Sequence, residues 1–117
     1  MARYDKYDPI SGGFRAPLDA DWGSALVGVP TGVGLNASGR IVAGAGNTGV
    51  LGVLVIDSPK SAGDIVDTMT SGEIVDAASL AAGTAYFAAT ADGVVSDVNT
   101  GTAIGHTVEA TRLVVRA

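Results

Sequence analysis

From residue 25 onward the sequence is a series of short runs of Val, Ile and Leu, each interrupted within a few residues by glycine. The interruptions include Asn-Thr-Gly, Asp-Gly and Ser-Gly, which are typical of tight turns. Seventeen glycines in 117 residues are too many for a helical bundle, because glycine weakens a helix interior. This sequence pattern predicts an all-β fold, a small β-barrel or β-sandwich built from short strands.

Ten segments have the character of strands. They are residues 25–29, 33–36, 41–43, 50–57, 65–69, 74–77, 85–90, 94–96, 103–109 and 112–116. Residues 50–56 are apolar on both faces, so that strand should be covered on both sides. Only residues 76–82 have a composition typical of a helix, and because they make only about two turns before Gly83, a turn or a short 3₁₀ segment is an equal alternative.

A weak internal repeat relates the two halves of this region. Residues 36–42 and 90–95 each have the pattern of a turn followed by the start of a strand. Each is followed by Asn-Thr-Gly, at 47–49 and 99–101. Two copies of such a unit predict pseudo-symmetric halves of a barrel and not a solenoid.

Residues 1–24 differ from the rest, because they hold four of the six aromatic residues and two prolines. Their apolar residues follow neither the helical nor the strand period, so we expect an extended N-terminal arm preceding a β-rich domain at 25–117. The aromatic side chains either fold over the domain's own core or anchor the arm on a partner. The residues predicted to contact a partner are Arg3, Tyr4, Tyr7, Ile10, Phe14, Arg15, Leu18 and Trp22.

Charge and composition argue against several partners. A formal charge of −5, with seven basic residues spread along the chain, does not favour nucleic acid. Cysteine is absent, which excludes a disulfide framework and thiolate metal sites. No signal-peptide core is present near the N-terminus, and no uninterrupted apolar run reaches the ~20 residues of a spanning helix, so no membrane partner is expected.

One motif resembles a nucleotide-binding loop in its letters alone. Residues 44–49 match G-x-G-x-x-G, but the β-branched residues that follow cannot form the helix whose N-terminus would bind a pyrophosphate. A hairpin turn is the better interpretation. His106 is the only histidine, and no sequence motif identifies a serine or acidic partner for it. Asp64, Glu73 and Asp92 adjoin glycines, as acidic residues in turns commonly do. We therefore expect no catalytic, cofactor-binding or metal-binding site, and no enzyme.

The order of the glycine-led phrases has a further implication. The sequence reads V-G-L-N-A-S-G-R-I-V, G-V-L-G-V-L-V-I-D, A-G-D-I-V-D, S-G-E-I-V-D, A-A-G-T-A-Y-F, A-D-G-V-V-S and I-G-H-T-V-E-A-T-R-L-V-V-R-A. In this it resembles the capsid decoration, or cement, proteins of tailed bacteriophages, especially those of actinobacteriophages. The resemblance covers most of the chain from about Val33.

The resemblance implies a structural protein that binds the outer surface of the assembled shell and stabilises it, commonly as a trimer. Its partners would be the phage major capsid protein and other copies of itself. It would be made in the host cytoplasm and end on the virion, with the N-terminal arm pairing with strands of the capsid protein. Two alternatives stay open: a tail or head-fibre component, and a carbohydrate-binding module that uses Trp22 and Tyr86.

Overall fold

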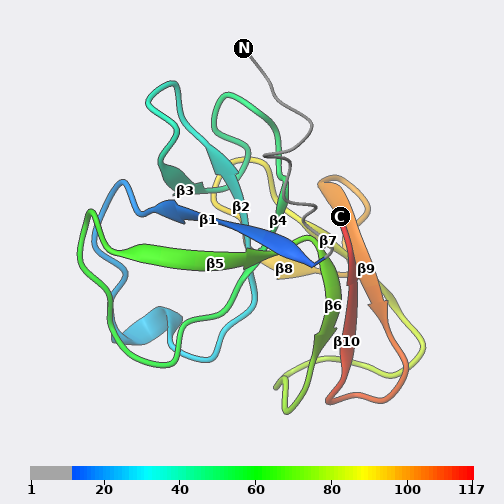
Figure 1. The fold of residues 1–117 in the computed structure, drawn as a ribbon. Helices are drawn as coiled ribbons and strands as arrows, with labels where there is room; N and C mark the ends of the chain where they lie inside the picture. Colours follow the sequence, from blue (N-terminus) through cyan, green and yellow to red (C-terminus); the bar gives the residue numbers. More distant parts are fainter. Residues whose placement is uncertain (1–11) are drawn as a thin grey trace, which may run out of the picture.

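Tight turns at glycine divide the chain into ten short strands and one 3₁₀ turn in the computed structural model, which describes residues 12–117 (Figure 1). The elements are β1 (Gly13–Pro17), η2 (Ser24–Leu26), β2 (Thr31–Leu35), β3 (Ile41–Ala43), β4 (Gly52–Leu54), β5 (Ile65–Met69), β6 (Ser71–Ile74), β7 (Ala85–Ala88), β8 (Val95–Ser96), β9 (Thr102–Thr107) and β10 (Leu113–Arg116). The all-β prediction is confirmed. No helix among these residues is long and apolar enough to cross a membrane.

The strands form two five-stranded antiparallel sheets that share one topology. The first has the order β1-β5-β4-β2-β3 and the second the order β6-β10-β9-β7-β8, so the second half of the chain repeats the connections of the first. The predicted repeat is confirmed, because its two copies lie at equivalent positions in the two sheets. Its two turns close equivalent hairpins, β2–β3 at Gly39 and β7–β8 at Gly93, where positive φ angles of 75° and 73° suit glycine.

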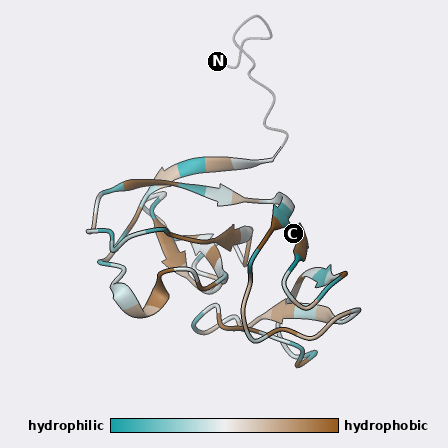
Figure 2. Ribbon diagram, turned by 90° about the horizontal axis from the view of Figure 1, so that it is seen from below, coloured by the Kyte–Doolittle hydropathy of each residue, from teal (hydrophilic) through white to brown (hydrophobic). Residues whose placement is uncertain are grey.

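Each sheet covers its own hydrophobic cluster. The first cluster contains Leu18, Trp22, Val33, Ile41, Leu54, Ile56 and Val66, and the second contains Val50, Val53, Tyr86, Ala88, Ile104, Leu113 and Val115. Strand β4 contributes to both, since Leu54 packs in the first cluster and its neighbour Val53 in the second. The predicted two-sided coverage of segment 50–56 is confirmed for β4, whereas Val55, just after it, is 38% exposed. Burying each of these two side chains contributes about 1.5–3 kcal/mol. Hydrophobic segments recur in the strands of both sheets (Figure 2).

A contact between two glycine backbones joins the halves. The Gly32 N–H donates to the Gly93 carbonyl oxygen over 2.8 Å, and Thr31 forms a β-bridge with Val94. A Cβ on Gly93 would lie 2.0 Å from the Gly32 oxygen, and one on Gly32 would lie 2.3 Å from the Ala88 Cβ. The two hairpins approach this closely because neither position carries a side chain.

One predicted strand is absent. Residues 25–29 form no strand, and Ser24–Leu26 is a single 3₁₀ turn instead. Residues 76–82, for which a turn was an open alternative, form no helix and turn between strands, with positive φ angles of 55° and 65° at Asp76 and Ser79.

Candidate partner-binding surfaces

The predicted contact residues fall into three groups. Arg3, Tyr4, Tyr7 and Ile10 lie outside the described residues. Leu18 and Trp22 are 0% and 4% exposed in the first cluster, so their prediction as partner contacts is wrong. Trp22 is also tied by its backbone, which exchanges hydrogen bonds of 2.8 and 2.9 Å with Lys60. These two side chains stabilise the domain itself.

The reason for their burial is strand β1, which the sequence did not predict. It pairs with β5 in a continuous register from Gly13 opposite Met69 to Pro17 opposite Ile65. That pairing carries the following residues across the first cluster. Residues 13–24, assigned to the arm from the sequence, therefore belong to the folded domain, and only residues 1–11 lie outside the described fold.

Phe14 and Arg15 alternate across β1. Phe14 is half-buried against the first cluster, whereas Arg15 points to the opposite face and pairs with Asp67, with 2.7 Å between Nε and Oδ1. The two charged side chains are 72% and 74% exposed. An ion pair this open to water contributes only about 0–1 kcal/mol, so Arg15 is available to a partner at little cost.

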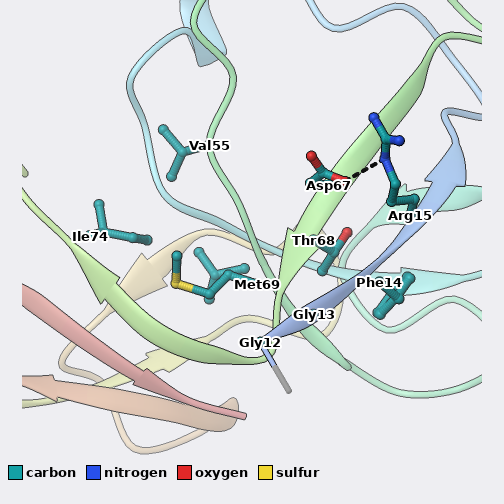
Figure 3. A pocket seen from close by; sticks show the side chains of 10 residues that line it. Gly12, Gly13, Phe14, Arg15, Val55, Asp67, Thr68, Met69 and Ile74 are labelled. Carbon is teal, nitrogen blue, oxygen red and sulfur yellow. Dashed lines mark ion pairs between the residues drawn. The ribbon is translucent and has the colours of Figure 1, made fainter. Parts of the chain in front are cut away.

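A hollow of about 390 Å³ opens beside this ion pair. Its lining residues are Gly12, Gly13, Phe14, Arg15, Val53, Val55, Asp67, Thr68, Met69 and Ile74. Figure 3 shows Val55, Met69 and Ile74 on one side of the hollow and the Arg15–Asp67 pair on the other. We call it the β1–β6 pocket, because it lies between the outward face of β1, β5 and β4 and the side of β6. Its aliphatic floor suits an apolar group.

A second apolar hollow lies where the two halves meet, and the side chains around it include Leu26, Val29, Pro30, Leu80 and Val94. Val29 and Val94 are 45% and 56% exposed. Clustered exposed apolar side chains mark interaction surfaces more often than isolated ones do. This hollow is a second candidate contact surface.

The nucleotide-like motif has a structural role. Residues 44–49 connect β3 to strand β4 and not to a helix, which confirms the turn interpretation. A Cβ on Gly44 would lie 2.6 Å from the Thr90 oxygen, and one on Gly46 would lie 2.6 Å from the Leu35 oxygen. The glycines allow close backbone packing at these points.

The acidic residues singled out in the sequence hold turns or surface pairs. An Asp64 carboxylate oxygen accepts from the Ser61 N–H over 2.8 Å, and an Asp92 oxygen accepts from the Val94 N–H over 3.1 Å. Glu73 lies 3.6 Å from Arg112 instead, on the exposed side of β6. His106 is exposed on β9, opposite Val114.

The aromatic residues considered for sugar binding do not converge. Trp22 lies in the first cluster and Tyr86 in the second, at 4% and 5% exposure. The Tyr86 hydroxyl accepts a hydrogen bond of 2.7 Å from the Ala81 N–H. Neither ring presents an open face on which a sugar could stack, so these residues provide no carbohydrate site.

Comparisons with known proteins give one informative likeness. No protein-family model matches the sequence, and no curated protein does either. Among solved structures, a chain from Mycobacterium phage Patience superposes with a TM-score of 0.77, covering 97% of this chain and 95% of that one at 21% identity. At this identity the likeness establishes a shared fold over nearly the whole length of both chains.

Proposed function

We propose that the protein is a structural component of a tailed-phage particle, and that it decorates the outside of the capsid shell without catalysing a reaction. The observation that carries this proposal is the likeness in fold to a phage chain over nearly the full length of both proteins. The glycine-led phrases that resemble decoration proteins support it independently of the fold. Within the particle it would contact the major capsid protein and further copies of itself.

The distribution of exposed apolar groups agrees with a binding role. The β1–β6 pocket and the hollow around Val29 and Val94 lie on different parts of the surface, so two neighbours can be contacted at once. A specific interface buries roughly 1,200–2,000 Å² in total, about half of it on each partner, so a domain of this size has surface for two such contacts. Repeated over a shell, many such contacts add resistance to internal pressure.

The contact residues on this proposal are Arg3, Tyr4, Tyr7 and Ile10, which lie outside the described residues, and the exposed Arg15. Phe14 contributes its outer edge, since it is only half-buried.

The test is a binding assay with emptied phage capsids. The full chain and a version beginning at Gly12 are mixed with capsids and sedimented, and circular dichroism first checks that both are folded. Truncation at Gly12 keeps β1 and the Trp22 region, so a loss of binding is not a loss of fold. Full-length Val98→Ser, altered at an exposed valine in the loop that follows β8, the edge strand opposite β6, is the matched control.

We expect the full chain and the control to coat capsids and the truncated chain to bind at least about tenfold more weakly, a difference of about 1.4 kcal/mol. Coating of tail tubes in place of capsids would instead favour the tail or head-fibre alternative. Absence of binding to any phage structure would overturn the proposal.

A further inference from the structure

Asp92 and Gly93 form the one Asp-Gly pair in the chain, and they lie in the turn between β7 and β8. In a flexible peptide this pair is reactive, because glycine has no side chain to keep its nitrogen away from the carboxyl carbon of the preceding aspartate. The Asp92 side chain is exposed to water, whereas Gly93 is buried. The turn therefore joins an accessible carboxyl group to a backbone nitrogen that the fold encloses.

The reaction of such a pair is an internal condensation. The Gly93 nitrogen attacks the carbon of the protonated Asp92 carboxyl group, an N–C bond forms, and the hydroxyl group leaves as water with the amide proton. Water then opens the cyclic imide at either carbonyl carbon. Opening at the side-chain carbon restores aspartate, and opening at the main-chain carbon gives isoaspartate. The mass is unchanged, but the isoaspartate main chain is longer by one carbon, about 1.5 Å.

Two hydrogen bonds within the hairpin oppose this reaction. The Gly93 N–H donates to the Ala89 carbonyl oxygen over 2.8 Å, so the proton that must leave is held by an acceptor and the peptide plane is fixed. An Asp92 carboxylate oxygen accepts from the Val94 N–H over 3.1 Å. The attack requires the peptide plane to turn toward the carboxyl carbon, which breaks the bond to Ala89. The turn must therefore open before it can react.

The first half of the chain holds the same turn closed. The Gly93 oxygen accepts from the Gly32 N–H over 2.8 Å, and the Thr90 oxygen accepts from the Ala45 N–H over 2.9 Å. A Cβ on Gly44 would lie 2.6 Å from the Thr90 oxygen, so the two backbones pack closely here. Opening the turn therefore separates it from the first half and requires more free energy than opening an isolated hairpin.

Asp57-Ser58 provides an internal comparison. Serine is also small, so this pair undergoes the same reaction, although more slowly than Asp-Gly in a flexible chain. Both residues are exposed in the loop between β4 and β5, and the Asp57 side chain is 93% exposed. Among residues 12–117 the Ser58 N–H donates no hydrogen bond. The fold leaves this pair open and encloses the more reactive one.

We propose that Asp92-Gly93 is a modification site that the folded protein keeps closed, and that it forms isoaspartate when the turn separates from the first half. The modified turn cannot return to its place. A Cβ on Gly93 would already lie 2.0 Å from the Gly32 oxygen, so the junction has no room for a longer main chain. Isomerisation thus makes the separation of the two halves permanent. This inference rests on the backbone geometry and does not require the proposed function.

The unaltered chain tests the first part of the proposal. It is incubated at neutral pH, folded in one sample and in urea above its unfolding midpoint in another. Peptide mapping with electron-transfer fragmentation then measures isoaspartate at both pairs over time. In urea Asp92 should isomerise faster than Asp57. In the folded protein the order should reverse, with Asp92 at least about tenfold slower than in urea, because a turn that is open less than about a tenth of the time reacts correspondingly slowly.

Two results of this comparison would overturn the proposal. One is isomerisation at Asp92 that is as fast as at Asp57 in the folded protein. The other is an Asp92 rate that is the same in the folded protein and in urea. Neither result depends on a variant that has to fold.

Gly32→Ala separates the role of the first half from that of the hairpin. Its Cβ would lie 2.3 Å from the Ala88 Cβ, which pushes β2 away from the turn, whereas Gly39→Ala meets nothing within 4 Å and is the matched control. After circular dichroism has checked folding, Asp92 should isomerise at least about fivefold faster in Gly32→Ala than in the control. Equal rates would show that the first half does not keep the turn closed. If Gly32→Ala does not fold, the comparison of the unaltered chain with and without urea decides alone.

The effect of the modification on the fold has its own measurement. Protein aged in urea is refolded, and ion-exchange chromatography separates the form modified at Asp92 from the unmodified form. The modified form should have a Tm at least about 8 °C lower, because it lacks the contact between the halves. Equal Tm values would show that the junction accommodates the longer main chain.

Discussion

Substitution of Gly93 by alanine tests the contact between the two halves, and the internal repeat supplies its control. Gly93 has a φ of 73° and closes the β7–β8 hairpin, while Gly39 has a φ of 75° and closes the equivalent β2–β3 hairpin. A Cβ on Gly93 would lie 2.0 Å from the Gly32 oxygen, whereas a Cβ on Gly39 would meet nothing within 4 Å. The two substitutions share the backbone penalty and differ in the collision.

The magnitude follows from these geometries. Alanine in the left-handed region costs roughly 1–2 kcal/mol, which is the whole expected loss for Gly39→Ala. At Gly93 the hairpin must also move by about an ångström, which removes a hydrogen bond worth about 1 kcal/mol and disturbs packing at Ala88 by about 1–3 kcal/mol. The expected loss for Gly93→Ala is therefore about 3–6 kcal/mol.

Urea and thermal unfolding of the three proteins measure the difference. For a domain of about 100 residues, each kcal/mol lowers Tm by roughly 4–8 °C, so Gly93→Ala should melt well below Gly39→Ala. Equal losses for the two variants would refute the reasoning, because the glycine contact would then contribute nothing beyond its backbone angle.

Three further predictions concern the core and the assembly. Trp22→Ala should reduce the free energy of unfolding by about 3–5 kcal/mol, because the side chain lies in the first cluster. Arg15→Ala should reduce it by less than about 1 kcal/mol, because its ion pair is exposed. Chemical denaturation measures both, and similar losses would contradict the placement of Trp22. Thr68→Val should raise the free energy of unfolding by up to about 1 kcal/mol, because the Thr68 hydroxyl is buried without a hydrogen-bond partner among the described residues. A lower free energy of unfolding for the variant in chemical denaturation would show that the hydroxyl has a partner. If the proposed self-association is correct, multi-angle light scattering of the full chain should give the mass of an oligomer, as for a trimer, and Val29→Ser with Val94→Ser should shift it toward the monomer; a monomer at all concentrations would count against self-association.

Local features of the sequence were sufficient for the fold class and for much of its detail. Turn chemistry acts over a few residues, so Gly39 and Gly93 could be recognised as hairpin turns, and the two-sided apolar run at 50–56 as a covered strand. The absence of a helix after residues 44–49 was equally local, since β-branched residues follow at once. The repeat of the β2–β3 and β7–β8 turns was visible for the same reason.

Whether the N-terminal residues fold into the domain depended on a strand that is distant in the sequence. Gly13–Pro17 has no strand-like pattern of its own and becomes a strand because β5, about 50 residues away, offers a matching edge. That pairing decides that Leu18 and Trp22 are core residues, and it leaves the β1–β6 pocket open where the described chain begins. Turns are determined by neighbouring residues, whereas burial is determined by which distant strands meet, and only the tertiary structure contains that information.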